Sequence, residues 1–170
     1  TYLGAGFDEA FLAENKVVHK VCRGTIQLSK DCWLFADFPR IFDFETIPER
    51  FVRGSLPNAK KDDFSDEVCL AVDTSKGIVV ISGCAHPGIL NMVTHIYNTL
   101  KRPIYAVLGG THLMEADGAR IDKTVKAMKE MGVHIIGFSH CSGEKAECEV
   151  KSDTNVKSCH LGTGDCFAID

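Results

Sequence analysis

Three apolar segments in the middle of the chain alternate with two segments whose apolar residues recur every three or four positions. The first pattern is typical of buried strands, and the second is typical of amphipathic helices. Strands that are joined by helices in this way form a parallel sheet with right-handed connections. The sequence therefore predicts an α/β fold. The expected strands are Ile78–Ile81, Ile104–Leu108 and Val133–Phe138, and the expected helices are 88–101 and 118–131.

A short turn that contains glycine or serine and one histidine follows each of these three strands. The histidines are His86, His112 and His140, each one strand-plus-helix unit after the last. Carboxyl ends of parallel strands meet at one edge of a sheet, where open α/β folds bind ligands, so we expect the three side chains to converge. Any one of them alone is more often an ordinary loop residue. Their equivalent positions predict a metal site, with zinc as the default ion and iron or manganese as alternatives.

The region before this unit is less regular. We expect strands at 17–22, 25–28 and 32–36, and then a long loop over 37–64 that phenylalanines anchor. Loops of that length inside a compact domain are usually functional or mobile. Basic residues in or beside it either hold the charge of a phosphate or form an ordinary solvated surface. They are Arg40, Arg50, Arg53, Lys60 and Lys61.

The remaining segments give weaker signals. Val68–Val72 and Ile78–Ile81 flank a turn and predict a β-hairpin. We expect a last strand at 167–169, whereas residues 144–156 are polar and undecided. His95 lies off the apolar face of its expected helix and is predicted to be solvated, and the other remaining histidines are expected to be structural or surface residues.

Charge and hydropathy exclude several classes of protein. With 19 Lys and Arg against 23 Asp and Glu, the net charge of -4 gives no basic surface for nucleic acid. No apolar run reaches the roughly 18 residues that cross a bilayer, so no membrane association is expected. The eight cysteines form no C-x-x-C pair, and Cys69 lies in an apolar run. We therefore expect reduced thiols and a cytoplasmic protein.

Four short motifs combine these features. They are Asp63–Glu67, Gly83–Asn91, Gly109–Leu113 and His140–Glu144. In their order and spacing they resemble the metallo-β-lactamase superfamily, and within it the dihydropterin–ribofuranosylaminobenzene phosphate synthase-like branch. Residues 36–40 match the substrate-side segment of that branch more weakly. The resemblance extends over about residues 17–169 and is strongest over 63–143.

The resemblance implies roles for four residues. His86 is similar to the histidine that completes the first metal site, and His140 to the histidine that binds the second metal, with two zinc ions in a complete site. His112 stands where better-known members have a bridging aspartate. It is implied to be catalytic as a proton donor, or else a metal ligand or a substrate-binding residue. Arg40 is implied to bind substrate.

One motif of the superfamily is missing, because no H-x-H-x-D-H is present in the sequence. The resemblance therefore implies that residues 1–170 are a single partial domain, the C-terminal part of an αββα sandwich. Residues 1–66 would form a strand-rich region with the substrate-side loop, and 67–170 the half with the metal ligands. The expected partner is the N-terminal half of the same protein or a second copy, covering an apolar sheet face.

The resemblance implies a metal-dependent hydrolase or transferase that acts on a phosphorylated or ester small molecule and is complete only with the upstream half. Metal ions in such sites polarise the substrate and lower the pKa of bound water to about 7. Two other hypotheses stay open. One is a non-catalytic binding module. The other is a redox or iron–sulfur protein that uses Cys84 and Cys141, although a cluster needs about four thiolates.

Overall fold

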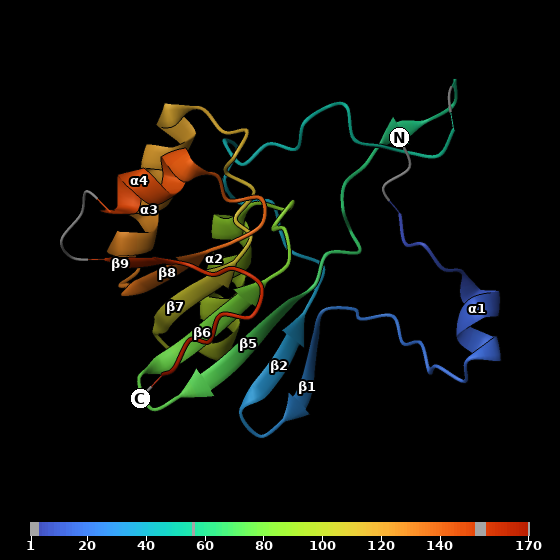
Figure 1. The fold of residues 1–170 in the computed structure, drawn as a ribbon, viewed down its shortest axis with the longest axis horizontal. Coiled ribbons are helices and arrows are strands. Elements are labelled where there is room, and N and C mark those ends of the chain that lie inside the picture. Colours follow the sequence, from blue (N-terminus) through green and yellow to red (C-terminus); the bar gives the residue numbers. More distant parts are fainter. Residues whose placement is uncertain (1–3, 56, 152–155, 170) are drawn as a thin grey trace.

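The computed structural model describes residues 4–55, 57–151 and 156–169. Seven strands form one mixed sheet in the order β1-β2-β5-β6-β7-β8-β9 (Figure 1). Strands β1, β2, β5 and β6 pair antiparallel, and β6, β7, β8 and β9 pair parallel. A separate antiparallel pair is formed by β3 and β4. The strands are β1 Thr25–Ser29, β2 Cys32–Phe35, β3 Val52–Arg53, β4 Lys60–Lys61, β5 Cys69–Thr74, β6 Gly77–Ser82, β7 Ile104–Gly109, β8 Ile135–Phe138 and β9 Lys157–His160.

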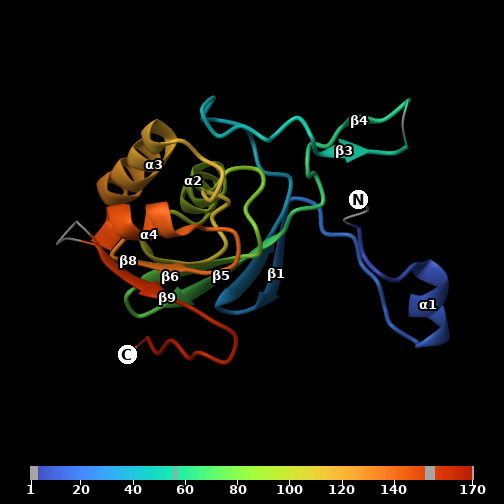
Figure 2. The same cartoon turned by 45° about the horizontal axis from the view of Figure 1, so that its top comes forward.

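Helices α2, α3 and α4 cover one face of this sheet, and the C-terminal segment crosses the opposite face (Figure 2). Helix α2 connects β6 to β7, and α3 connects β7 to β8, as the alternating sequence pattern predicts. The α/β fold class is therefore confirmed. Helix α1 lies apart from the sheet in both views (Figures 1 and 2). The helices are α1 Glu9–Glu14, α2 Ile89–Leu100, α3 Gly118–Glu130 and α4 Glu144–Lys151.

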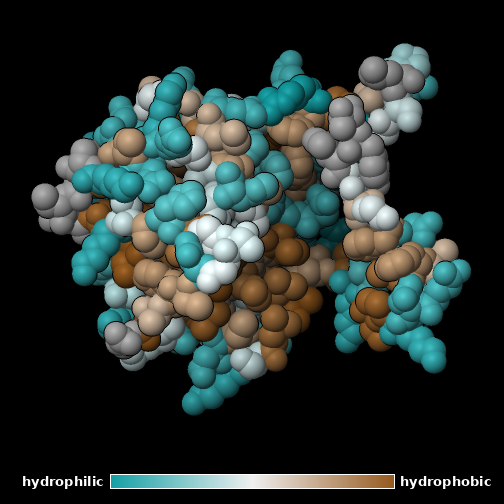
Figure 3. All heavy atoms as spheres, viewed as in Figure 1, coloured by the Kyte–Doolittle hydropathy of each residue, from teal (hydrophilic) through white to brown (hydrophobic). Residues whose placement is uncertain are grey.

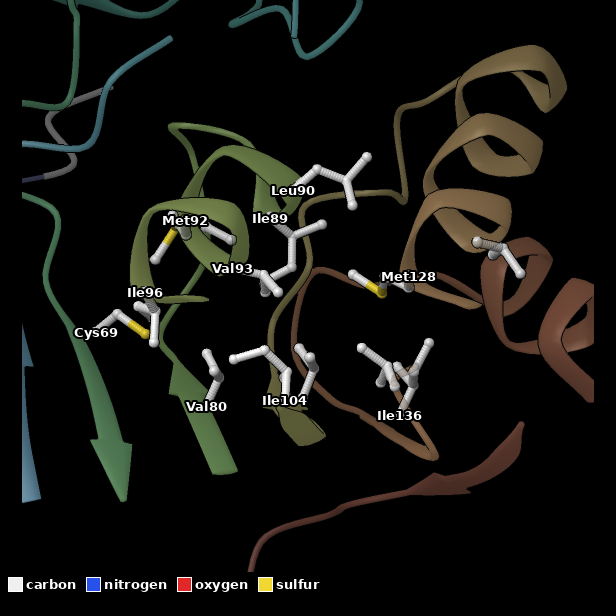
Figure 4. Packing of buried hydrophobic residues seen from close by; sticks show 14 of the residues in the cluster. Cys69, Val80, Ile89, Leu90, Met92, Val93, Ile96, Ile104, Met128 and Ile136 are labelled. Atoms are coloured by element: carbon white, nitrogen blue, oxygen red, sulfur yellow. The ribbon is translucent and has the colours of Figure 1, made fainter. Parts of the chain in front are cut away.

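The main core lies between the sheet and these helices. On α2, Ile89, Met92 and Ile96 are completely buried, and their spacing places them on one face of the helix. They pack over Val80 and Ile104 of the sheet (Figure 4). Each such side chain contributes about 1.5–3 kcal/mol when it is fully buried. This packing fixes β6, β7 and β8 side by side, so that the turns after them meet at one edge.

Two of the expected strands are wrong. Residues 17–22 form no strand, because their backbone pairs with no neighbouring strand. The side chain of Val18 is accordingly 81% exposed. Residues 167–169 also form no strand. The last strand is instead β9, which pairs with β8, and part of the undecided segment forms α4. The predicted hairpin is confirmed as β5 and β6.

The other face of the sheet has a smaller apolar cluster. Val79, Ala106, Leu108 and Ile135 are buried there, beneath partly buried residues that include Phe167 of the C-terminal segment. Hydrophobic atoms gather over β5, β6 and this segment (Figure 3). The cover is incomplete.

The described part of the chain contains no helix with the length and apolar character needed to span a lipid bilayer.

Candidate metal centre

The three turns that follow β6, β7 and β8 share an unusual backbone conformation. Ala85, His112 and His140 have φ values of 62°, 51° and 50°, in the left-handed region that L-residues other than glycine rarely adopt. Each such residue costs about 1–2 kcal/mol, which the surrounding packing must offset. Strain of this kind concentrates at functional sites, where it holds side chains in fixed positions.

The first two of these turns touch through their backbones. The N–H of Gly110 donates to the carbonyl of Gly83 over 3.1 Å. A Cβ atom at Gly110 would lie 2.3 Å from the same oxygen, so only glycine fits there. The hydroxyl of Ser82 also donates to the Gly110 carbonyl over 2.7 Å. The turn after β8 joins them, because the N–H of Thr111 donates to Ser142 Oγ.

Glu67 orients the side chain of His86. The Nδ1 of His86 lies 2.7 Å from Glu67 Oε2, and the backbone N–H of His86 donates to the same oxygen. Burial of Glu67 by itself raises its pKa, but the hydrogen bonds from His86 outweigh this effect, and the pKa is lowered. An ionised carboxylate only accepts hydrogen bonds, so Nδ1 carries the proton. With the proton on Nδ1, the lone pair of Nε2 can bind a metal ion.

His112 lies beside His86, with the two ring centroids 4.7 Å apart. It is buried, and neither of its ring nitrogens has a hydrogen-bond partner within the described part of the chain. Burial, with a smaller contribution from His86, lowers the pKa of His112 to about 4, so the imidazole is neutral at pH 7. A buried neutral imidazole without a partner is costly unless something else binds its nitrogens.

Two phenylalanines of the long loop enclose these histidines. The ring of Phe64 stacks on His86 at 3.8 Å with an interplanar angle of 7°. Phe51 contacts Phe64, His86 and His112, with centroid distances of 5.3, 5.9 and 6.2 Å. The loop is therefore anchored by aromatic residues, as predicted, and it supplies an apolar wall to the histidine pair.

His140 makes a different contact. Its Nε2 lies 3.1 Å from Cys84 Sγ, and Cys141 Sγ donates to the carbonyl of Cys84 over 3.3 Å. Burial raises the pKa of Cys84 to about 12, and burial also raises the pKa of Cys141. Both groups are therefore thiols at neutral pH. His140 also lines a cavity of about 240 Å³ between β8, β9 and α4.

Arg40 is exposed and donates a hydrogen bond to the Asp63 carbonyl. It lines an open cavity of about 290 Å³ together with Lys61 and the buried Glu45. Two other basic residues of the loop are engaged, since Arg53 pairs with Asp62 at 2.9 Å and Arg50 pairs with Glu115.

Glu45 and Asn91 attach this loop to helix α2. The carboxylate of Glu45 accepts hydrogen bonds from the N–H groups of Leu90 and Asn91, over 2.9 and 2.7 Å. In return, Asn91 Oδ1 accepts from the N–H groups of Ile41 and Phe42. Glu45, which lines the cavity beside Arg40, is therefore held against the first turn of α2.

The structure thus brings His86 and His112 together, and it places His140 against Cys84. Glu67 has no role predicted from the sequence, although this residue lies in a motif that carried the resemblance. The contact of His160 was also not predicted. The Nδ1 of His160 lies 3.4 Å from Glu147 Oε2. His95 was predicted to be solvated, and this prediction is wrong. Its side chain is half-buried against the rings of Phe35 and Phe38.

A sheet with helices on one face and histidine turns at one edge is shared with a solved structure. The chain matches the crystal structure of Tm1679, described as a metal-dependent hydrolase of the beta-lactamase superfamily, with a TM-score of 0.78 and 30% identity. The alignment covers 90% of this chain and 58% of that one. The metallo-β-lactamase-like fold is thereby confirmed.

Within that superfamily the chain resembles the branch predicted from its motifs. It is 48% identical over 87 residues to 7,8-dihydropterin-6-methyl-4-(beta-D-ribofuranosyl)-aminobenzene-5'-phosphate synthase of Methanocaldococcus jannaschii, covering 51% of this chain and 30% of that protein. An uncharacterised protein of the same organism, MJ0448, is 29% identical over 136 residues, covering 80% of this chain. The chain spans only 30% and 50% of the lengths of these two relatives. No family model matches the sequence.

Proposed function

We propose that this chain contributes to the active site of a metal-dependent enzyme that acts on a phosphorylated or ester small molecule. The observation that carries the proposal is the histidine pair. His86 is oriented by Glu67, and 4.7 Å away His112 is buried with both ring nitrogens unpaired in the described structure. Both follow parallel strands at one edge of the sheet, where α/β folds bind their ligands.

The residues present fit a metal ion. His86 offers an Nε2 lone pair, and His112 offers a neutral imidazole that has no protein partner among the described residues. We assign both as ligands of one ion, zinc by default for imidazole donors, with iron or manganese as alternatives. A bound metal in such a site polarises a phosphoryl or ester oxygen and lowers the pKa of a bound water. Glu67 holds the imidazole of His86 in the tautomer that this role requires.

Substrate binding is assigned to the cavity beside the long loop. Arg40 and Lys61 supply positive charge there, and the loop is fixed to α2 through Glu45. A guanidinium recognises phosphate or carboxylate groups through paired hydrogen bonds. Arg40 therefore binds the anionic group of the substrate in this proposal, and Phe51 and Phe64 exclude water from the histidine side.

The remaining metal ligands are proposed to come from a second polypeptide segment. The sequence has no H-x-H-x-D-H motif, and the chain spans 58% of the structure of Tm1679. The N-terminal half of the same protein is the proposed source, and a second copy of this chain is the alternative.

The eight cysteines are all free, which supports a reducing, cytoplasmic location.

The proposal is tested first by intact mass and metal analysis of the purified material, and then by turnover of phosphodiesters and pterin phosphates. We expect a second polypeptide to co-purify with about two metal ions, and a chelator to abolish activity. His86→Ala should lower kcat/KM by about 100-fold or more. Activity that survives both the chelator and His86→Ala would contradict the metal-dependent mechanism. Full activity of the isolated chain would contradict the need for a second segment.

A further inference from the structure

A guanidinium in the first turn of α3 has buried donors without partners. Arg120 donates from Nη1 to the carbonyl of Thr46 over 3.0 Å. Its Nε and Nη2 are buried, and neither has a hydrogen-bond partner in the described part of the chain. A guanidinium only donates hydrogen bonds and stays charged in proteins. Buried donors without a partner are rare in folded proteins, so these two require an explanation.

The two donors lie on one edge of the guanidinium. The N–H bonds of Nε and Nη2 run parallel there, and such an edge matches two oxygens of a carboxylate or a phosphate. Arg102 of the same chain shows this use of the edge, because its Nε and Nη2 both donate to Asp73 Oδ1, over 3.3 and 2.8 Å. Arg120 therefore presents a pair of donors that is suited to an oxoanion.

The neighbouring carboxylates of the chain are engaged elsewhere. Glu45 accepts hydrogen bonds from two N–H groups in the first turn of α2, and Asp117 accepts from the backbone N–H of Arg120. Burial lowers the pKa of Arg120, and both carboxylates oppose this effect, so both lie within electrostatic range. Neither accepts a hydrogen bond from the guanidinium, since its Nη1 binds Thr46 and its other nitrogens have no partner among the described residues.

The guanidinium lies between the long loop and α3. Thr46, which it binds, has neighbours on both sides that line the cavity beside Arg40. Three positions further along α3, the ammonium of Lys123 lies 5.3 Å from the ring centroid of Phe44. The loop therefore runs along the first turns of α3, and Arg120 lies directly behind a segment that lines the cavity.

Access to these donors requires a movement of the loop. Nε and Nη2 are out of contact with solvent, so an anion reaches them only when the segment around Thr46 shifts. One hydrogen bond from the Arg120 side chain holds that segment to α3. A buried guanidinium attracts an anion more strongly than an exposed one does, because less water screens the two charges. Binding of an anion and displacement of the loop are therefore coupled.

We propose that Arg120 binds one oxoanion, a phosphate or a carboxylate group, through Nε and Nη2, and that the segment around Thr46 moves to admit it. This site is separate from Arg40 and from the proposed metal ligands. It needs neither a metal ion nor a second polypeptide, and it does not rest on the proposed enzymatic function.

The test follows the Nε–H resonance of Arg120 by NMR of isotope-labelled protein, together with any polypeptide that co-purifies. A chelator is present, so that no metal ion binds the probe. Inorganic phosphate and acetate are the probes, and sodium chloride at equal ionic strength is the blank. We expect a saturable shift with a Kd of about 10 mM or lower. The probe that saturates the resonance identifies the ligand as a phosphate or a carboxylate. The Nε–H of Arg102 is the internal control and should not shift, because Asp73 already binds that edge.

A conservative variant tests the role of the parallel donors. Arg120→Lys keeps the charge but loses the paired N–H groups, so binding followed at the backbone amides of residues 45–47 should weaken by about tenfold or more. Arg102→Lys is the matched control and should bind the probe as the wild type does. Circular dichroism establishes that each variant is folded, and if Arg120→Lys does not fold, the wild-type resonance decides alone.

Three outcomes would overturn the proposal. The first is an Arg120 resonance that neither phosphate nor acetate shifts up to about 50 mM. The second is a shift of equal size with sodium chloride. The third is a folded Arg120→Lys chain that binds the probe as tightly as the wild type. None of these outcomes depends on turnover, so a failure of this site is distinct from a failure of the proposed function.

Discussion

Glu67 shows how one carboxylate controls a neighbouring imidazole. It accepts hydrogen bonds from both the ring and the backbone N–H of His86, and its side chain is only 9% exposed. The pair is separated by 19 positions in the sequence, with a β-hairpin between them. No periodicity or local motif indicates such a contact, because the hairpin alone brings the two residues together. The histidines were therefore predictable from their turns, and the residue that orients His86 was not.

Glu67→Ala should weaken metal binding at the histidine pair by about 10–100-fold, because His86 loses the partner that fixes its tautomer and ring orientation. The zinc affinity is measured by competition with a chelating dye. Asp66→Ala is the matched control, since the side chain of Asp66 is 84% exposed. Equal affinities for the Glu67 and Asp66 variants would show that Glu67 does not orient the ligand.

His95 illustrates a different error of local reasoning. It lies off the most apolar face of α2, yet the rings of Phe35 and Phe38 meet it edge-on at 5.8 and 5.9 Å. Burial against these rings lowers the pKa of His95 below its ordinary value of 6.5. The helical pattern indicated which side chains face the sheet, but the aromatic residues that cover the flank of α2 come from β2 and the long loop.

The lowered pKa of His95 has a definite consequence for stability. The unfolded chain binds a proton at His95 more readily than the folded chain does, so the stability that neutral His95 contributes is present above about pH 6.5 and is lost as the pH falls through the folded pKa. His95→Gln cannot titrate, and the free energy of unfolding of the wild type should therefore fall relative to this variant on acidification. Urea unfolding at several pH values measures the difference. A difference that stays constant from about pH 8 to about pH 5 would contradict this account.

At the scale of the elements, the turns after the parallel strands are set by close backbone contact. Gly110 has no room for a side chain, because the Gly83 carbonyl and Cys141 Sγ already occupy the space. The glycine-rich pattern predicted sharp turns there, and the contact between two of these turns explains why Gly110 cannot be replaced freely.

Gly110→Ala should lower the free energy of unfolding by about 1–3 kcal/mol, because the added methyl group forces the two turns apart. Gly118→Ala is the matched control. Nothing lies within 4 Å of a Cβ atom at that position, and the change should be neutral or raise stability by up to about 1 kcal/mol. Denaturant titration of both variants checks the first expectation, and similar stabilities would contradict it.

The elements that were not predicted from the sequence have weak local signals. β9 alternates little between buried and exposed residues, and α4 buries only Ala146 and Val150. Their positions depend on pairing with β8 and on packing over the sheet, which a short window of sequence does not contain. Residues 17–22 show the converse, because an apolar segment forms no strand where no neighbouring strand is available.

At the scale of the whole molecule, the two faces of the sheet are covered unequally. Helices α2, α3 and α4 seal one face, whereas the other has only the C-terminal segment over its small apolar cluster (Figure 2). Ile81, on β6, remains 41% exposed. The sequence predicted an incompletely covered sheet face through its resemblance to a two-sheet sandwich. It did not predict that Phe167 and Ile169 would lie across this face without forming a strand.

Phe167 should act as the main anchor of that segment, because its ring is partly buried against the cluster that contains Val79 and Leu108. Phe167→Ala should lower the free energy of unfolding by roughly 1–2 kcal/mol, less than the roughly 3–5 kcal/mol of a fully buried phenylalanine. It should also increase the fluorescence of a dye that binds exposed apolar surface, because Val79 and Leu108 become accessible to solvent. Ala168→Ser, an exposed neighbour, is the control and should change neither quantity. If Phe167→Ala leaves both the stability and the dye fluorescence at wild-type values, the segment does not protect this face in solution.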